Sequence, residues 1–177
     1  MEIYYVAYGS NLDTERMERR CPEAKIVGTS EIKGYRLLFK RSLTGCYATI
    51  EQDANCSVPV LVYKMSENDE FRLDRCEGYP RYYYKDSFLL TVKSLRGRRL
   101  KEPRSCVAYI MHEYRKLGQP GEDYYELIER GYERFGFDKT VLEKALSDSI
   151  GTEAASMWLA RYNGEERGNE KVHSVWV

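Results

Sequence analysis

Histidine is scarce in this chain, with His112 and His173 as the two examples among 177 residues. A catalytic triad built on histidine, or a histidine-rich metal site, therefore has little material available. The five cysteines are an odd number, are widely scattered and include no C-x-x-C pair. This distribution is typical of small core residues in a reducing compartment and argues against a disulfide framework.

Net charge and long apolar runs are also missing. Lys and Arg total 28, Asp and Glu total 28, and no basic run is interleaved with aromatic residues. We therefore expect no nucleic-acid partner. The apolar stretches have the length of strands, and the N-terminus starts directly with one. We expect neither a membrane helix nor a signal peptide, and hence a cytoplasmic location without a membrane partner.

The pattern that is present predicts an α+β fold, because strands in the first half are followed by helices. The length fits one domain, placed at 1–150, followed by a C-terminal extension or tail at 151–177. Strands are predicted over residues 2–8, 31–40, 47–51, 58–65, 82–93 and 105–111. Predicted helices run from a cap at Asn11 or Asp13 to 20, from 66 to 77, from 120–123 to 135 and from 138 to about 150, with a short helix to about 162.

The most informative segment is Tyr8-Gly9-Ser10-Asn11-Leu12, which follows a predicted strand and precedes a predicted helix. Glycine lets the main chain turn and approach a ligand closely, and the N-terminus of a helix favours negative charge. The loop can therefore hold a carboxylate or a developing oxyanion. Gly-Ser-Asn is also ordinary turn chemistry between a strand and a helix.

A second segment, Leu73-Asp74-Arg75-Cys76-Glu77-Gly78-Tyr79-Pro80, places Glu77 where a helix is predicted to end. Gly78 suits the left-handed position after a helix, and Pro80 bars continuation. A glutamate at a helix end is usually a solvated charge. Combined with the first loop, it predicts an anion cradle with a carboxylate base.

The two segments resemble the motifs of the γ-glutamylcyclotransferase-like family, also called AIG2-like or BtrG-like. Residues 8–12 are similar to its Y-G-S-N-L loop, and residues 73–83 are similar to its L-D-x-x-E-G-x-P-x-x-Y segment. Residues 48–50 and 60–65 resemble family strands in the right order. The similarity covers about residues 1–115 well and reaches about 147, whereas residues from 151 onward match nothing in the family.

The resemblance implies a small mixed β-barrel with flanking helices and a helical C-terminal region. It also implies an enzyme that needs neither metal nor cofactor, with Glu77 as the general acid/base. The implied substrate-binding residues are Tyr8, Gly9, Ser10, Asn11, Leu12 and Tyr83. A one-residue slip in the alignment would put Tyr84 in the place of Tyr83.

The chemistry of a γ-glutamyl amide fits this assignment. Its α-amine can reach the γ-carbonyl and close a five-membered ring, with an effective molarity of about 10⁵ M or more. One carboxylate could take the proton of the α-amine and return it to the leaving amine, provided that partial burial raises its pKa toward neutrality. The products would be 5-oxoproline and a free amine or amino acid.

Several alternatives stay open at this point. The leaving group could instead make the chain a γ-glutamylamine cyclotransferase or a γ-glutamyl deprotecting enzyme of a biosynthetic pathway. A non-catalytic binding module could use the same fold, although the presence of Glu77 favours catalysis. The expected partner is a small γ-glutamyl substrate, and the chain is expected to be a monomer or homodimer.

Overall fold

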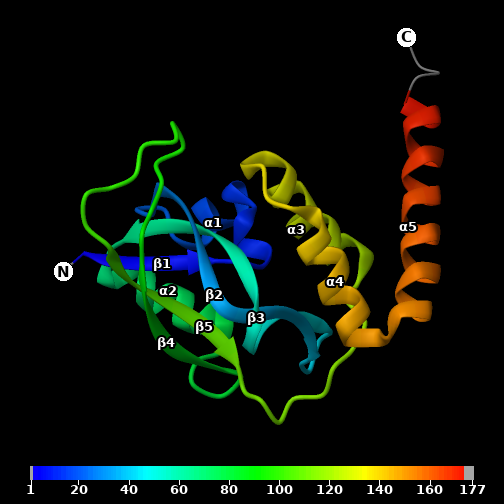
Figure 1. Cartoon of the computed structure of the whole chain (residues 1–177), viewed down its shortest axis with the longest axis horizontal. Helices are drawn as coiled ribbons and strands as arrows, with labels where there is room; N and C mark the ends of the chain where they lie inside the picture. Colours follow the sequence, from blue (N-terminus) through cyan, green and yellow to red (C-terminus); the bar gives the residue numbers. More distant parts are fainter. Residues whose placement is uncertain (1, 174–177) are drawn as a thin grey trace.

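The computed structural model describes residues 2–173, with their side chains as far as residue 164. Figure 1 shows a strongly curved sheet with helices packed around it and the last helix standing to one side. Of the residues predicted as an extension or tail, 151–177, those from Thr152 to His173 form this one helix, and 174–177 lie outside the described residues.

The sheet is mixed and has the strand order β2-β3-β1-β5-β4. Its strands are β1 (Ile3–Ala7), β2 (Lys25–Arg41), β3 (Cys46–Met65), β4 (Tyr83–Leu90) and β5 (Arg104–Met111). The short central strand β1 pairs antiparallel with β3 and parallel with β5, and the other neighbours are antiparallel. Because β1 lies at the centre, the loop that follows it emerges in the middle of the molecule.

The predicted α+β class is confirmed, but the sheet is not closed into a barrel. Its edge strands are β2 and β4, and β2 meets the segment after β4 at an isolated bridge between Thr29 and Lys93. Gly28 makes this approach possible, because a Cβ atom there would lie 1.9 Å from the Lys93 carbonyl oxygen. The Ser30 hydroxyl also donates to the Thr91 carbonyl across this seam, and the rings of Tyr35 and Phe88 meet there edge to face, but β2 and β4 do not pair as neighbouring strands.

Two predicted strands are one in the structure. The segments 47–51 and 58–65 both belong to β3, which pairs with β2 over almost its whole length as a long hairpin. Polar residues such as Gln52, Asp53 and Asn55 interrupt the apolar pattern that predicts a strand, but main-chain pairing with β2 continues past them. Strand length here follows from the partner strand and not from local composition.

The first four α-helices begin and end close to where local signals predict, whereas the last one runs beyond its predicted end at about residue 162. They are α1 (Thr14–Arg20), α2 (Glu67–Glu77), α3 (Glu122–Phe135), α4 (Lys139–Ile150) and α5 (Thr152–His173), with a 3-10 turn η1 (Ser10–Leu12) before α1. The carboxylate of Asp13 caps α1 by accepting from Arg16 N, and the hydroxyl of Ser66 caps α2 by accepting from Asp69 N. Within the described residues, no helix is long and apolar enough to cross a membrane.

Candidate active site

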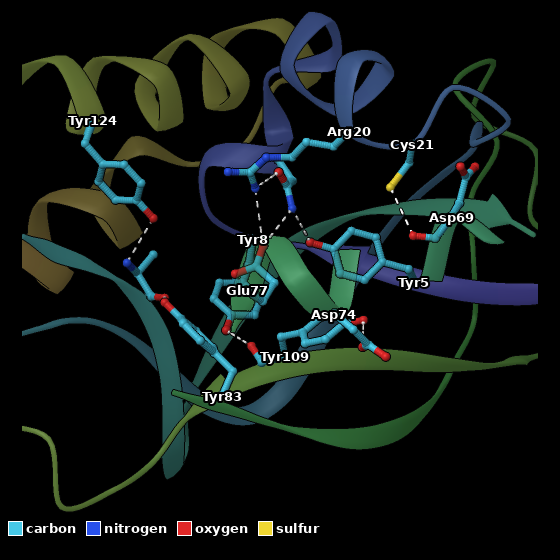
Figure 2. A network of polar contacts seen from close by, with 12 residues as sticks. Tyr5, Tyr8, Arg20, Cys21, Asp69, Asp74, Glu77, Tyr83, Tyr109 and Tyr124 are labelled. Carbon is cyan, nitrogen blue, oxygen red and sulfur yellow. Dashed lines mark hydrogen bonds and ion pairs between the residues drawn. The ribbon is translucent and has the colours of Figure 1, made fainter. Parts of the chain in front are cut away.

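Glu77 is the last residue of α2, and Gly78 ends the helix in the left-handed conformation with φ 67°. A residue with a Cβ atom would be strained at this φ, so glycine is required for the sharp exit. Figure 2 shows the Glu77 side chain among Tyr8, Tyr83, Arg20 and Tyr5, which come from different elements. The helix end thus carries a carboxylate into the interior and not to the surface.

The Glu77 carboxylate is held through one of its oxygens. Oε1 accepts from the Asn11 amide Nδ2 at 3.3 Å and lies 3.4 Å from Nη1 of Arg20. The same Arg20 Nη1 donates to Asn11 Oδ1 at 2.9 Å, so the three groups form a closed triangle. Among residues 2–164, no group hydrogen-bonds the other oxygen, Oε2, which is therefore available to a ligand.

Burial raises the pKa of the Glu77 carboxyl above its ordinary value, while Arg20, Asn11 and Arg16 oppose the rise. The side chain is 18% exposed, so it is reachable from outside but largely removed from water. A carboxylate with a raised pKa is a better base near neutral pH than a solvated one. Perturbed carboxylates of this kind are common in active sites.

The loop after β1 forms the opposite side of this site. Residues Ser10–Leu12 make one 3-10 turn, and a Cβ atom on Gly9 would lie 3.1 Å from the Ala48 Cβ and 3.3 Å from the Tyr124 hydroxyl. The N–H groups that open a helical turn have no acceptor inside it. The close packing against Gly9 therefore explains why this position lacks a side chain, and the turn offers main-chain donors beside Glu77.

Two hollows meet at Glu77. The inner one has a volume of about 30 Å³ and is lined by Tyr5, Tyr8, Gly9, Ser10, Asn11, Ala48, Glu77, Tyr83, Tyr109 and Tyr124. The outer cleft has a volume of about 330 Å³, and it shares Ser10, Glu77, Tyr83 and Tyr124 with the inner one. These four shared residues mark the junction at which a bound molecule would contact the carboxylate.

Tyrosines form half of the inner wall, and three of their hydroxyls are hydrogen-bonded to the main chain. Tyr8 donates to the Tyr109 carbonyl, and Tyr83 donates to the Ala48 carbonyl at 3.3 Å. Tyr124, from α3, accepts from Ala48 N at 3.0 Å, and burial raises its pKa to about 12. The hydroxyls therefore stay protonated and uncharged near neutral pH.

The alternative between two neighbouring tyrosines has a clear geometric answer. Tyr83 is 7% exposed and lines both hollows. Tyr84 points to the other face of β4, where its hydroxyl donates to Glu113 Oε1 at 2.6 Å. The alternation of side chains along a strand separates the two.

Of the residues predicted to contact a ligand, Leu12 is not brought to either hollow. Its side chain is fully buried, and it packs so closely on α3 that a Cβ atom on Gly131 would lie 2.4 Å from the Leu12 Cβ. Tyr8, Gly9, Ser10, Asn11, Glu77 and Tyr83 all line the inner hollow. Leu12 instead anchors η1 to the helical layer.

Arg16, Arg20 and Tyr124 are site residues that sequence reasoning did not identify. Arg16 and Arg20 are four residues apart on α1, which puts them on one helix face, and both line the outer cleft. That spacing, directly after the loop, was a usable signal. Tyr124 had none, because it reaches the site through the packing of α3 on η1.

Other parts of the molecule show no comparable site. Within the described residues, no group of three or more His, Cys, Asp or Glu could hold a metal ion. A larger hollow of about 770 Å³ lies at the open seam between β2 and the end of β4, and it shares no lining residue with the two hollows at Glu77. The fold and the site therefore define a small α+β protein with a single half-buried carboxylate opposite a main-chain turn.

Comparison with known proteins gives a consistent result. The family described as "Gamma-glutamyl cyclotransferase, AIG2-like" matches residues 5–134. The gamma-glutamylcyclotransferase of Bos taurus is 31% identical over 139 residues, covering 75% of this chain and 71% of that protein. The gamma-glutamylcyclotransferase of Homo sapiens is 31% identical over 149 residues, covering 79% and 75%. A solved structure named "Gamma-glutamyl cyclotransferase" matches with a TM-score of 0.68 at 27% identity, covering 82% of this chain and 86% of that one.

The chain therefore belongs to the AIG2-like gamma-glutamyl cyclotransferase family and is an enzyme. The resemblance seen in the two sequence motifs is confirmed by a match that includes both of them.

Proposed function

We propose that this enzyme cyclises the γ-glutamyl group of a small amide, releasing 5-oxoproline and a free amine or amino acid, with Glu77 as general base and then general acid. The observation that carries the proposal is the Glu77 carboxylate. It lies at the junction of the two hollows, with Oε1 held by Asn11 and Arg20 and Oε2 free for a ligand.

The reaction moves two protons from the substrate's α-ammonium to the leaving nitrogen, and Glu77 would carry both in turn. Glu77 Oε2 takes a proton from the substrate's α-ammonium, and the freed amine attacks the γ-carbonyl carbon to form a new C–N bond. The tetrahedral oxyanion then collapses, the original amide C–N bond breaks, and the protonated Glu77 gives its proton to the leaving nitrogen. The carboxylate, ionised again, takes the second proton from the new ring nitrogen and passes it to the released amine, which leaves as an ammonium. Atoms and charges balance without a metal, an oxidant or a water molecule.

The surroundings of Glu77 support this cycle. The raised pKa suits a group that must both accept and return a proton near neutral pH. The turn at Gly9, Ser10 and Asn11 supplies main-chain donors for a negative oxygen, either the α-carboxylate or the developing oxyanion. Removal of one such donor typically lowers kcat by about 10² to 10³.

The size of the hollows supports an orientation for the substrate. The inner hollow, of about 30 Å³, has room for one small polar group, which suits the end of the glutamyl head group that reaches the junction. The outer cleft, at about 330 Å³, is the larger of the two and is left for the leaving amine. Holding the glutamyl chain folded at the junction would supply the proximity that ring closure requires.

The proposal predicts that Glu77→Gln nearly abolishes kcat for 5-oxoproline release, because the amide cannot accept and return the proton. Release is measured by mass spectrometry with a panel of γ-glutamyl amino acids and γ-glutamyl amines. The matched control is Glu70→Gln on the same helix, a carboxylate that pairs with Lys85 and lines neither hollow, and it should keep wild-type turnover. Unchanged turnover in Glu77→Gln would remove Glu77 from the mechanism.

The panel also separates the enzyme from a binding module. A wild-type protein that shows a ligand-induced rise in Tm but no product from any compound would behave as a binder. Product from wild type but not from Glu77→Gln would support the cyclotransferase.

A further inference from the structure

The outer cleft carries an excess of positive charge that the proton cycle at Glu77 does not use. Its charged lining residues are Arg16, Arg20, Arg75 and Glu77. Arg20 is engaged with the Glu77–Asn11 triangle described above. The guanidinium groups of Arg16 and Arg75 are therefore available to bind a ligand in the cleft.

Neither of these two groups forms a salt bridge with a carboxylate among the described residues, although the charge of Arg16 acts on Glu77 at longer range. The main-chain N–H of Arg16 donates to the Asp13 carboxylate. The side-chain Nε of Arg16 is buried and has no hydrogen-bond acceptor among the described residues. Arg75 lies in the last turn of α2, exposed, and forms no ion pair in the described part of the chain. A buried donor without a partner is costly, so the Arg16 side chain is prepared for an acceptor that the protein itself does not supply.

Further positive charge lies next to another lining residue of the cleft. Tyr82 lines the cleft, and the guanidinium groups of Arg115 and Arg81 lie 5.0 Å and 5.5 Å from its ring centroid. Hydroxyl-bearing residues Ser42 and Thr44 line the same cleft from the loop between β2 and β3. Guanidinium and hydroxyl donors around one cleft suit carboxylate oxygens, and they disfavour a second amine.

We propose that Arg16 and Arg75 form a leaving-group subsite that selects γ-glutamyl compounds whose leaving amine carries two negative charges, such as an acidic amino acid. This inference rests on the proposed function, because it assumes that the amine released at Glu77 occupies the outer cleft. Each guanidinium would bind one carboxylate, and Arg16, the deeper of the two, would take the one nearer the scissile bond.

The test compares kcat/KM for three substrates that differ in the charge of the leaving amine: γ-glutamylethylamide, γ-glutamylalanine and γ-glutamylglutamate. Wild type should prefer them in rising order of negative charge, with about tenfold for each added carboxylate, the size expected of a charge-assisted hydrogen bond. Raising the salt concentration should reduce the preference, since partly exposed charges are screened.

Variants identify the residues responsible. Arg75→Gln should reduce the preference for γ-glutamylglutamate over γ-glutamylalanine by about tenfold, mainly through KM. Arg16→Gln should reduce the preference for γ-glutamylalanine over γ-glutamylethylamide by about the same factor. Arg72→Gln is the control, because this exposed arginine lies on the same helix but does not line the cleft. Its preferences should equal those of wild type, and thermal melting checks that all variants fold.

The outcomes are distinguishable. Product release with the same preference in wild type, Arg16→Gln and Arg75→Gln would overturn the subsite while leaving the cyclotransferase in place. No 5-oxoproline from any of the three substrates would overturn the proposed function and, with it, the subsite.

Discussion

Glu77 is under opposing influences that together set its behaviour as a base. Burial raises the pKa of its carboxyl, and the nearby charge of Arg20, the amide of Asn11 and the charge of Arg16 hold the rise in check. The base must be ionised to accept a proton from the substrate. Activity should therefore fall as the pH drops through this raised pKa, at a higher pH than for an ordinary glutamate.

Replacing Arg20 tests this balance. Arg20→Gln removes the strongest influence that lowers the pKa of Glu77, so the acid limb of the pH profile of kcat/KM should move to higher pH. The measurement is kcat/KM for 5-oxoproline release between pH 5 and 9. Arg19→Gln, an exposed neighbour on α1 that lines neither hollow, should keep the wild-type profile. An acid limb in Arg20→Gln at or below the wild-type position would contradict this account of the site.

At the scale of the elements, η1 is positioned by packing as well as by its own sequence. Leu12 turns away from the ligand side of the loop and fits against Gly131 of α3, where a Cβ atom would lie 2.4 Å from the Leu12 Cβ. Ser10 and Asn11, on the same turn, line the inner hollow. The contact of α3 with η1 therefore fixes the turn on which the proposed donors lie.

Gly131→Ala should consequently damage both stability and activity. An added methyl group at such a distance forces the turn or the helix to move, which typically lowers the free energy of unfolding by about 1–3 kcal/mol, against a gain of about 1 kcal/mol from helix propensity. Urea unfolding and kcat/KM are the measurements. A second helical glycine, Gly164, has open space around its Cβ position, so Gly164→Ala should be neutral or stabilising with normal activity. Equal stability of the two variants would mean that the Leu12–Gly131 contact does not constrain the turn.

The ends of the helices could be predicted from the sequence because their causes are local. Ser66 caps α2 and Gly78 ends it, and Asp138 caps α4 by accepting from Thr140 N. The continuity of β3 could not be predicted in this way, because its polar residues 53–56 lie in an irregularity of the register, and pairing with the same strand β2 on both sides of it keeps β3 in one piece. Signals within a few residues predict element ends, whereas strand length depends on partners distant in sequence.

At the scale of the whole molecule, the site likewise has a part that local sequence signals predict and a part that depends on packing between distant elements. Tyr8 to Asn11 and Glu77 could be found because each lies at a break between elements, where main-chain conformation demands a particular residue type. Arg20 and Tyr124 meet them only after β1, α1, α2 and α3 have packed. Side-chain convergence of this kind depends on the complete fold, and no short segment of the sequence encodes it.

Helix α5 bears on whether residues 151–177 are a separable extension, as the sequence suggests. Trp158 is 3% exposed and packs edge-on against Tyr125 of α3 at 4.9 Å between ring centroids. Tyr162 stacks on Trp158 at 5.1 Å and meets Tyr125 edge-on at 5.4 Å, so the three rings contact one another. Tyr125 directly follows Tyr124, which lines both hollows at Glu77. The first turns of α5 therefore support the helix that carries a wall of the site.

This arrangement predicts that Trp158→Ala lowers the free energy of unfolding by about 3–5 kcal/mol, the usual effect of removing a buried tryptophan. Met157→Ala, at a neighbouring position that is 71% exposed, should change it by no more than about 0.5 kcal/mol. Urea unfolding followed by circular dichroism measures the stability of both variants. Under conditions where both stay folded, kcat/KM should fall for Trp158→Ala alone, because the helix that carries Tyr124 loses its packing partner. If the two variants unfold at the same urea concentration, α5 is an appendage that the catalytic domain does not need. A single transition shifted to lower urea in Trp158→Ala would instead make α5 part of one cooperative unit with the site.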